Sequence, residues 1–285
     1  STPADWLVQP FVESVTMQRA LAAGSLAAVA CGLVGTWVVL RSMTFLGDAL
    51  AHGVIPGIAL ASVLGFDLAL GAALSAVVMI LGITLVSRRA RLAEDTAIGL
   101  LFVGMLAVGV LIVSSSRSFA GDLTSFLFGG ITSVGTRDVV LAGVVAVVTA
   151  AAVTVGYRAF LALTFNARTA KLLGLRPGLA HAVLMVLVTG AVVSSFTTVG
   201  SLLVFALITA PSAAAVQLVN RVPWVLVTSV VFAEVAVVAG LLVSWHARLA
   251  AGAAMATSAV ALFVLAFVVA EVRRALGARR AATAG

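Results

Sequence analysis

The sequence predicts an all-α fold, a polytopic bundle of transmembrane helices. Hydrophobic residues fill 62% of its 285 positions and charged residues only 9%, whereas a water-soluble domain carries about 45–50% apolar and about 25% charged residues. The apolar residues also fall into runs of about 20, the length that a helix needs to cross the hydrocarbon core of a membrane. These observations exclude a soluble globular domain and a disordered chain.

Four of the runs lie in the first half of the chain, over approximately residues 18–40, 44–64, 68–87 and 96–114. The first is rich in Ala and Gly, small residues that allow membrane helices to approach closely. Gly and Pro interrupt the second run, so we expect a kinked helix there. The third run ends at a cluster of arginines, and the fourth starts behind two acids, which suit the positive end of a helix dipole.

Five further runs cover approximately residues 138–161, 178–196, 198–219, 223–245 and 249–271. Nine spans are therefore the favoured count, and they are expected to form a single transmembrane domain over residues 1–285. Eight spans, with one segment re-entrant, is the alternative.

Two stretches are too polar to span. Residues 1–16 are expected on the outer face, and residues 115–137 are expected to form an amphipathic or re-entrant segment on that face, where protein or water satisfies its backbone. The first run is not expected to be a signal peptide, because no polar n-region, apolar h-region and cleavage site occur in that order. Because the sequence opens with Ser1 instead of Met, trimming or processing of the N-terminus is expected.

Basic residues gather at alternate ends of the runs, at Arg41, Arg221 and in clusters over 88–91, 158–176 and 273–280. The positive-inside rule makes this side cytoplasmic, with the N-terminus outside and the C-terminus inside. The net charge of +7 is thus explained by topology. No contiguous basic patch of the kind that nucleic acid requires is present in the sequence.

Enzymatic ATP hydrolysis is not expected of this chain. Its only lysine, Lys171, lies outside any GxxxxGK[ST] sequence, so the chain lacks a P-loop and ATP-driven work must come from a partner chain. The single Cys31 excludes an internal disulfide and thiolate metal chemistry.

The kinked second run carries two ionisable residues, Asp48 and His52, in the sequence FLGDALAHGVIPG. Their spacing of four places both side chains on one helical face, where a carboxylate and an imidazole suit Mn²⁺, Zn²⁺ or Fe²⁺. The alternative is a buried Asp–His hydrogen bond that pins the helix. A single copy supplies too few ligands for an ion, so the pair favours two copies around a shared axis. The residues expected at the kink are Gly47, Gly53, Pro56 and Gly57.

For the other ionisable residues in or near the apolar runs, a structural role is favoured over a functional one. Glu234 could relay protons or cations, but we favour a carboxyl that hydrogen-bonds a neighbouring Ser or Thr. Glu94 and Asp95 are explained as a helix start. His181 and His246 each stand alone in the sequence, which is more typical of a structural role.

These motifs resemble those of the permease subunits of metal-uptake ABC transporters, the importers of manganese, zinc and iron. The resemblance covers about residues 10 to 220. It rests on PF…MQRAL near the start, LRSMTFLGDALAHGVIPG (40–57), EDTAIGLLF (94–102), GDLTSFLFGG (121–130) and VGSLLVFALITAPSAAA (199–215). The sequence departs from the family in its last outer loop, His246 to Gly252, and in Glu234.

The resemblance implies a homodimer, two copies of a separate ABC ATPase and an external metal-binding protein, with surrounding membrane lipid and no nucleic acid. It carries the metal contact over to Asp48 and His52. It also implies a short cytoplasmic coupling helix over 210–221. The sequence supports this helix because Pro211 is expected to break the seventh span, and the alternative is a plain end of that span. The residues expected to contact the ATPase are Ala210, Pro211, Ser212, Ala213, Ala214 and Ala215.

The function expected is therefore the permease of an ATP-driven importer of divalent transition metal ions, with Mn²⁺ favoured and Zn²⁺ or Fe²⁺ as alternatives. The metal is cargo, and no permanently bound cofactor is expected. A permease for chelated iron, haem or cobalamin would instead need a wide cavity. An ion-coupled secondary transporter would use Glu234 and no ATPase.

Overall fold

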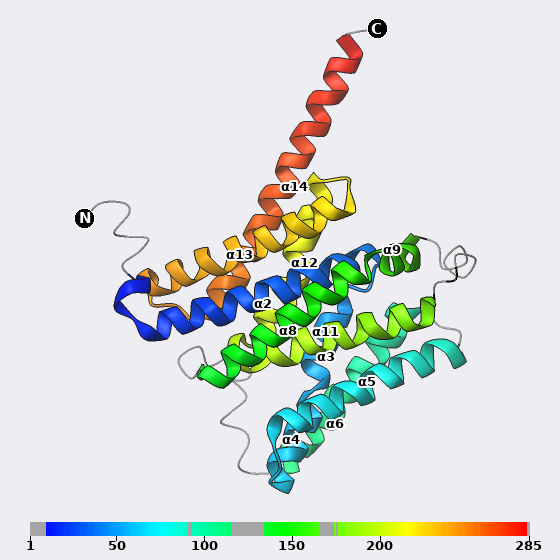
Figure 1. Ribbon diagram of the computed structural model, residues 1–285, viewed down its shortest axis with the longest axis vertical. Helices are drawn as coiled ribbons and strands as arrows, with labels where there is room; N and C mark the ends of the chain where they lie inside the picture. Colours follow the sequence, from blue (N-terminus) through cyan, green and yellow to red (C-terminus); the bar gives the residue numbers. More distant parts are fainter. Residues whose placement is uncertain (1–9, 91–92, 116–133, 166–173, 175, 284–285) are drawn as a thin grey trace.

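The computed structural model describes residues 10–90, 93–115, 134–165, 174 and 176–283, and the described elements are helices (Figure 1). Their order is α2 (Val15–Leu40), α3 (Phe45–Gly53), α4 (Ile55–Leu64), α5 (Leu68–Ala90), α6 (Glu94–Ser115), α8 (Thr136–Val155), α9 (Tyr157–Phe165), α11 (Pro177–Val199), α12 (Ser201–Leu218), α13 (Val222–Ala247) and α14 (Ala251–Thr283).

Eight stretches of the described chain are long and apolar enough to cross a membrane, and α3 and α4 together form one of them. The predicted seventh span corresponds to α12, whose apolar part, Leu203–Leu218, is shorter than the others. The whole of α12 has 18 residues, which extend about 27 Å at 1.5 Å per residue. This length is just under the roughly 30 Å of a hydrocarbon core. The all-α polytopic bundle is confirmed.

Helix α2 is the centre of one half of the bundle, where it packs against α8, α11, α12 and α13. Glycines bring these helices close. A Cβ at Gly24 would lie 2.8 Å from the Val237 side chain of α13, and a Cβ at Gly35 would overlap the Ile208 carbonyl of α12. The small residues noted in the first run thus set the distance between helices, as packing in membranes requires.

Helices α4, α5 and α6 form a second group, below the α2 group in Figure 1. The closest approach is between Gly57 of α4 and Gly71 of α5, where a Cβ on either residue would overlap the carbonyl of the other. Gly57 was expected at the kink, but it lies one turn beyond it and serves this close helix crossing.

The structure corrects several predicted boundaries. The fifth span ends at Val155, because the helix is interrupted at Gly156 and resumes as α9. The last helix continues to Thr283. The predicted segment 115–137 falls mostly outside the described residues.

The expected break at Pro211 is absent. Helix α12 runs through this proline to Leu218, so residues 210–215 do not begin a separate helix. Ala210, Ser212, Ala214 and Ala215 are buried, and the Ser212 hydroxyl donates a 2.7 Å hydrogen bond to Ser229 of α13. Ser229 in turn donates to the Gly32 carbonyl of α2 at 3.0 Å. This stretch therefore holds three helices together inside the bundle.

Candidate functional site

The predicted break in the second span lies at Val54, between α3 and α4. Pro56 occupies the first turn of α4, where its missing N–H costs no hydrogen bond of that helix. The Val54 amide still donates to Leu50, so the break is confined to a single residue. The interruption lies two residues before Pro56.

Asp48 and His52 face each other across one turn of α3. The Oδ1 atom of Asp48 lies 3.2 Å from Nδ1 of His52, and the same nitrogen lies 3.1 Å from the Asp48 carbonyl oxygen. Because Asp48 engages Nδ1, Nε2 is the ring nitrogen left to contact a cation. A carboxylate that orients an imidazole in this way is a common arrangement behind metal-binding histidines.

The pair lies on the open face of α3. Six of the nine residues of this helix are buried, and the other three are Phe45, Asp48 and His52. Phe45 is 59% exposed, and the Asp48 and His52 side chains are 31% and 23% exposed. Phe102 of α6 packs edge-on against the imidazole, with ring centroids 5.6 Å apart. The two ligand-type side chains thus reach a surface that this single chain leaves uncovered.

The opposite face of α3 is fixed by close contacts. A Cβ at Gly47 would lie 3.2 Å from Ile208 of α12, and a Cβ at Gly53 would lie 2.8 Å from the Met79 sulfur of α5. The Gly53 carbonyl at the end of α3 accepts a buried 2.6 Å hydrogen bond from Ser75 of α5. Gly47 and Gly53 were expected to serve the kink, and the structure shows them serving close packing behind the pair.

The described residues contain no group of three or more His, Cys, Asp or Glu side chains that could hold a metal ion. Asp48 and His52 therefore offer two side-chain donors from one chain. Zn²⁺ in a closed site takes four ligands, so a second set must come from elsewhere for a complete shell.

Sequence reasoning missed a second polar cluster. Glu94, at the start of α6, lies 3.6 Å from the Arg41 guanidinium at the end of α2 and 3.2 Å from Nε2 of His181 in the first turns of α11. Within the described residues, Nε and Nη1 of Arg41 are buried without a partner. The pKa of Arg41 is lowered overall, because burial lowers it more than the nearby Glu94 carboxylate raises it. The sequence gives no sign that Glu94 and His181 are neighbours, because they belong to different helices that only the fold brings together.

Glu234 lies beside Ser25 of α2, which is its hydrogen-bonding neighbour. This agrees with the expectation of a Ser or Thr partner, and the serine lies on a neighbouring helix. The His246 ring nitrogen Nδ1 lies 2.8 Å from the Leu242 carbonyl of its own helix. Neither residue lies in the Asp48–His52 pair.

Residues 13–270 match the ABC 3 transport family. The chain belongs to this family. A manganese transport system membrane protein MntC of Listeria monocytogenes is 34% identical over 251 residues, which cover 88% of this chain and 89% of that protein. A probable iron transport system membrane protein of Haemophilus influenzae is 30% identical over 272 residues, 94% of this chain and 98% of that one.

A solved structure carries the same fold. PsaBC from Streptococcus pneumoniae, in complex with Fab, superposes with a TM-score of 0.82 at 28% identity, over 93% of this chain and 95% of that chain. The chain is therefore a multi-pass membrane subunit of a bacterial ABC importer, and the ATPase resides in a separate chain. Membership also implies an ATPase and a substrate-binding protein as partners, and the ion-coupled secondary transporter is set aside.

Proposed function

We propose that this permease imports Mn²⁺ and that Asp48 and His52 contact the ion during transit. The observation that carries the proposal is the pairing of a carboxylate and an imidazole, 3.2 Å apart, on the one open face of an interrupted membrane helix. An ionisable residue at such a place is costly and marks a pathway by default. The manganese transporters among the relatives support the choice of metal.

The chemistry of the pair suits a transient contact. Nε2 of His52 and the carboxylate of Asp48 form a mixed N/O set for a divalent transition ion. A transported ion must leave as readily as it enters, so a site with few donors is an advantage. No cofactor needs to remain bound, and high affinity would belong to the external binding protein.

A homodimer would complete the site. Partly exposed Asp48 and His52 side chains that face hydrocarbon would be unfavourable. A second copy placed against α3 would cover both side chains and add an equal set of donors. Each copy would bind one ABC ATPase on the basic side of the membrane. By the positive-inside rule that side is the cytoplasm, which puts the N-terminus outside and the C-terminus inside.

The ATPase contact still falls at the end of α12 in our proposal, within 210–221. Because Ala210 to Ala215 are mostly buried, they would transmit force through packing. The exposed residues Val216 and Asn220 would supply the contact surface.

Metal-resolved uptake tests the proposal. Cells without their own importers would express the chain with its cognate ATPase and binding protein, and accumulated Mn, Zn and Fe would be measured by mass spectrometry. We expect Mn to rise with the native chain and to fall to background with Asp48→Ala or His52→Ala. Asp95→Ala, an exposed acid of α6, is the matched control and should transport normally. Normal uptake by both site variants would refute the pathway assignment.

Iron is the second candidate, because iron transport proteins are among the relatives at comparable coverage. The same experiment separates the two metals. If no free metal accumulates while the complex hydrolyses ATP, a chelate becomes the favoured cargo and Asp48 returns to a structural role.

A further inference from the structure

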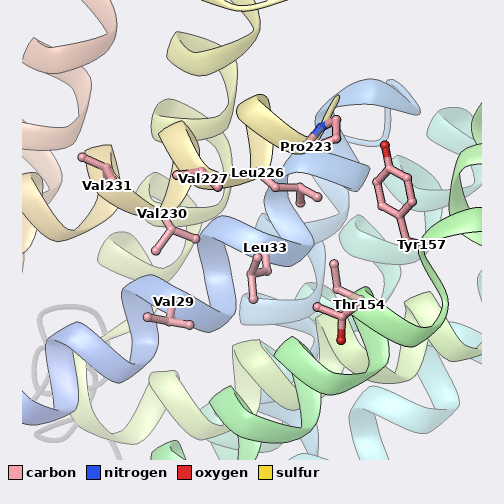
Figure 2. A pocket seen from close by; sticks show the side chains of 10 residues that line it. Val29, Leu33, Thr154, Tyr157, Pro223, Leu226, Val227, Val230 and Val231 are labelled. Carbon is pink, nitrogen blue, oxygen red and sulfur yellow. The ribbon is translucent and has the colours of Figure 1, made fainter. Parts of the chain in front are cut away.

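An apolar groove runs along the outside of the bundle between α8 and α13, with α2 as its floor (Figure 2). Its volume is about 610 Å³. Val29 and Leu33 form the floor, Thr154 and Tyr157 form one wall, and Val227 and Val230 form the other. All three helices are membrane-crossing stretches, so the groove lies at the depth of the lipid.

The groove is remote from the Asp48–His52 pair. Helices α11 and α12 each pack against both α2 and α3, so they separate the groove on α2 from the open face of α3. A second copy that covers α3 around the proposed pathway would therefore leave the groove facing the membrane. What fills it must come from the surrounding bilayer.

One end of the groove has the composition of a membrane interface. Tyr157 and Pro223 lie together at this end in Figure 2, and Val29 lies toward the other. Trp37 holds the Tyr157 ring in an edge contact at 5.9 Å. Next in sequence to these two lining residues are the exposed Arg158 and Trp224. Aromatic residues of this kind gather at the headgroup level.

The same end carries positive charge. Arg158 adjoins Tyr157 in α9, and Arg221 precedes the first turn of α13 by one residue; both arginines are exposed. Guanidinium groups bind phosphate well because their donors match its oxygens. The opposite end is different, because one helical turn beyond Val29 and Val230 lie Ser25 and the acidic Glu234. The end of the groove near Arg158 and Arg221 is therefore basic, and we call it the basic mouth; the rest of the groove is lined mostly by apolar residues.

We infer that this groove binds an anionic phospholipid, with one acyl chain between α8 and α13 and the phosphate between Arg158 and Arg221. The wall of α13 from Pro223 to Val231 extends about 12 Å at 1.5 Å per residue. That is most of one leaflet, which is about 15 Å of a 30 Å core. The basic mouth falls on the side that we propose to be cytoplasmic, where anionic lipids attract basic residues.

Native mass spectrometry of the full-length chain tests the site. The detergent-solubilised protein would be titrated with phosphatidylglycerol or with phosphatidylcholine of identical acyl chains, and bound lipids would be counted on each oligomeric form. We expect a several-fold preference for phosphatidylglycerol. Arg158→Gln combined with Arg221→Gln should reduce that preference to near one. Val227→Trp should fill the groove and remove the tightly bound lipid for both headgroups.

The matched control is Val243→Trp, the same change at an exposed valine of α13 that does not line the groove. It should retain the lipid and its selectivity. Equal lipid retention by Val227→Trp and Val243→Trp would overturn the inference, as would equal binding of the two headgroups by the native chain. If Val227→Trp converts a dimer to a monomer without changing bound lipid, the groove is a contact between copies instead. The readout is independent of metal transport, so failure of the proposed function leaves this test intact.

Discussion

Glu94 and His181 meet at 3.2 Å between Oε1 and Nε2, and the second carboxylate oxygen of Glu94 lies 3.6 Å from Arg41. One acid thus joins the ends of α2, α6 and α11 at the basic side of the bundle. The Arg41 side chain is only 14% exposed, and a buried charge without a partner is unfavourable. Glu94 therefore links three helix ends on this side, in addition to its place at the start of α6.

Neutralising Glu94 should destabilise the protein. Glu94→Gln removes the charge that faces the largely buried Arg41, and we expect a loss of about 1–3 kcal/mol, the usual cost of leaving a buried polar group unsatisfied. Thermal unfolding in detergent would measure the loss. Asp95→Asn changes the adjacent exposed acid and should have little effect. Equal melting temperatures for the two variants would contradict the assigned role.

The hydrogen bond between Ser212 and Ser229 should behave as a coupled pair. The two hydroxyls form consecutive hydrogen bonds that end at the Gly32 carbonyl. Removing the second serine should therefore lower the free energy of unfolding by less once the first is gone. In membranes such hydrogen bonds average about 0.6 kcal/mol. Unfolding of Ser212→Ala, Ser229→Ala and the double variant gives the coupling energy. Strict additivity would argue against the pair.

Gly57 should not tolerate a side chain. A Cβ there would overlap the Gly71 carbonyl, and because backbone must move to make room, Gly57→Ala should cost about 1–3 kcal/mol. Gly104→Ala in α6 is the control, since a Cβ at Gly104 meets nothing within 4 Å. Melting temperatures of the two variants decide the matter, and a stable Gly57→Ala protein would require a different α4–α5 crossing.

Glu234 should be dispensable for transport. Its neighbour is the Ser25 hydroxyl, and an amide can replace a carboxyl in that contact. We expect Glu234→Gln to retain metal uptake in the cellular assay, whereas loss of uptake with normal expression would revive the relay hypothesis.

The helices could be predicted because hydropathy and helix breakers are local properties. The apolar runs marked each membrane helix, and Pro56 marked the break in the second one. Pro211 was misjudged for a tertiary reason: α12 stays continuous there because buried contacts with α2 and α13 hold it. Gly156 interrupts a helix for which the sequence showed no stronger signal than its many other glycines.

The candidate site was predictable to the extent that it lies within one helical turn. The four-residue spacing alone brought Asp48 and His52 together. The Arg41–Glu94–His181 cluster could not be found in this way, because its members belong to three helices. Glu94 lies opposite Arg41 and His181 only because the fold brings the ends of α2, α6 and α11 to the same side of the bundle.

The hydrogen bond from Ser75 to the Gly53 carbonyl ties α5 to the turn of α3 that carries His52. Gly53 directly follows His52, so the imidazole is anchored on one side by its own helix and on the other by a neighbour that carries neither ligand. We therefore expect a shift of the α4–α5 pair to move the turn of α3 that carries His52. The position of the proposed cation contact would then depend on the packing of α5 as well as on Asp48 and His52 themselves.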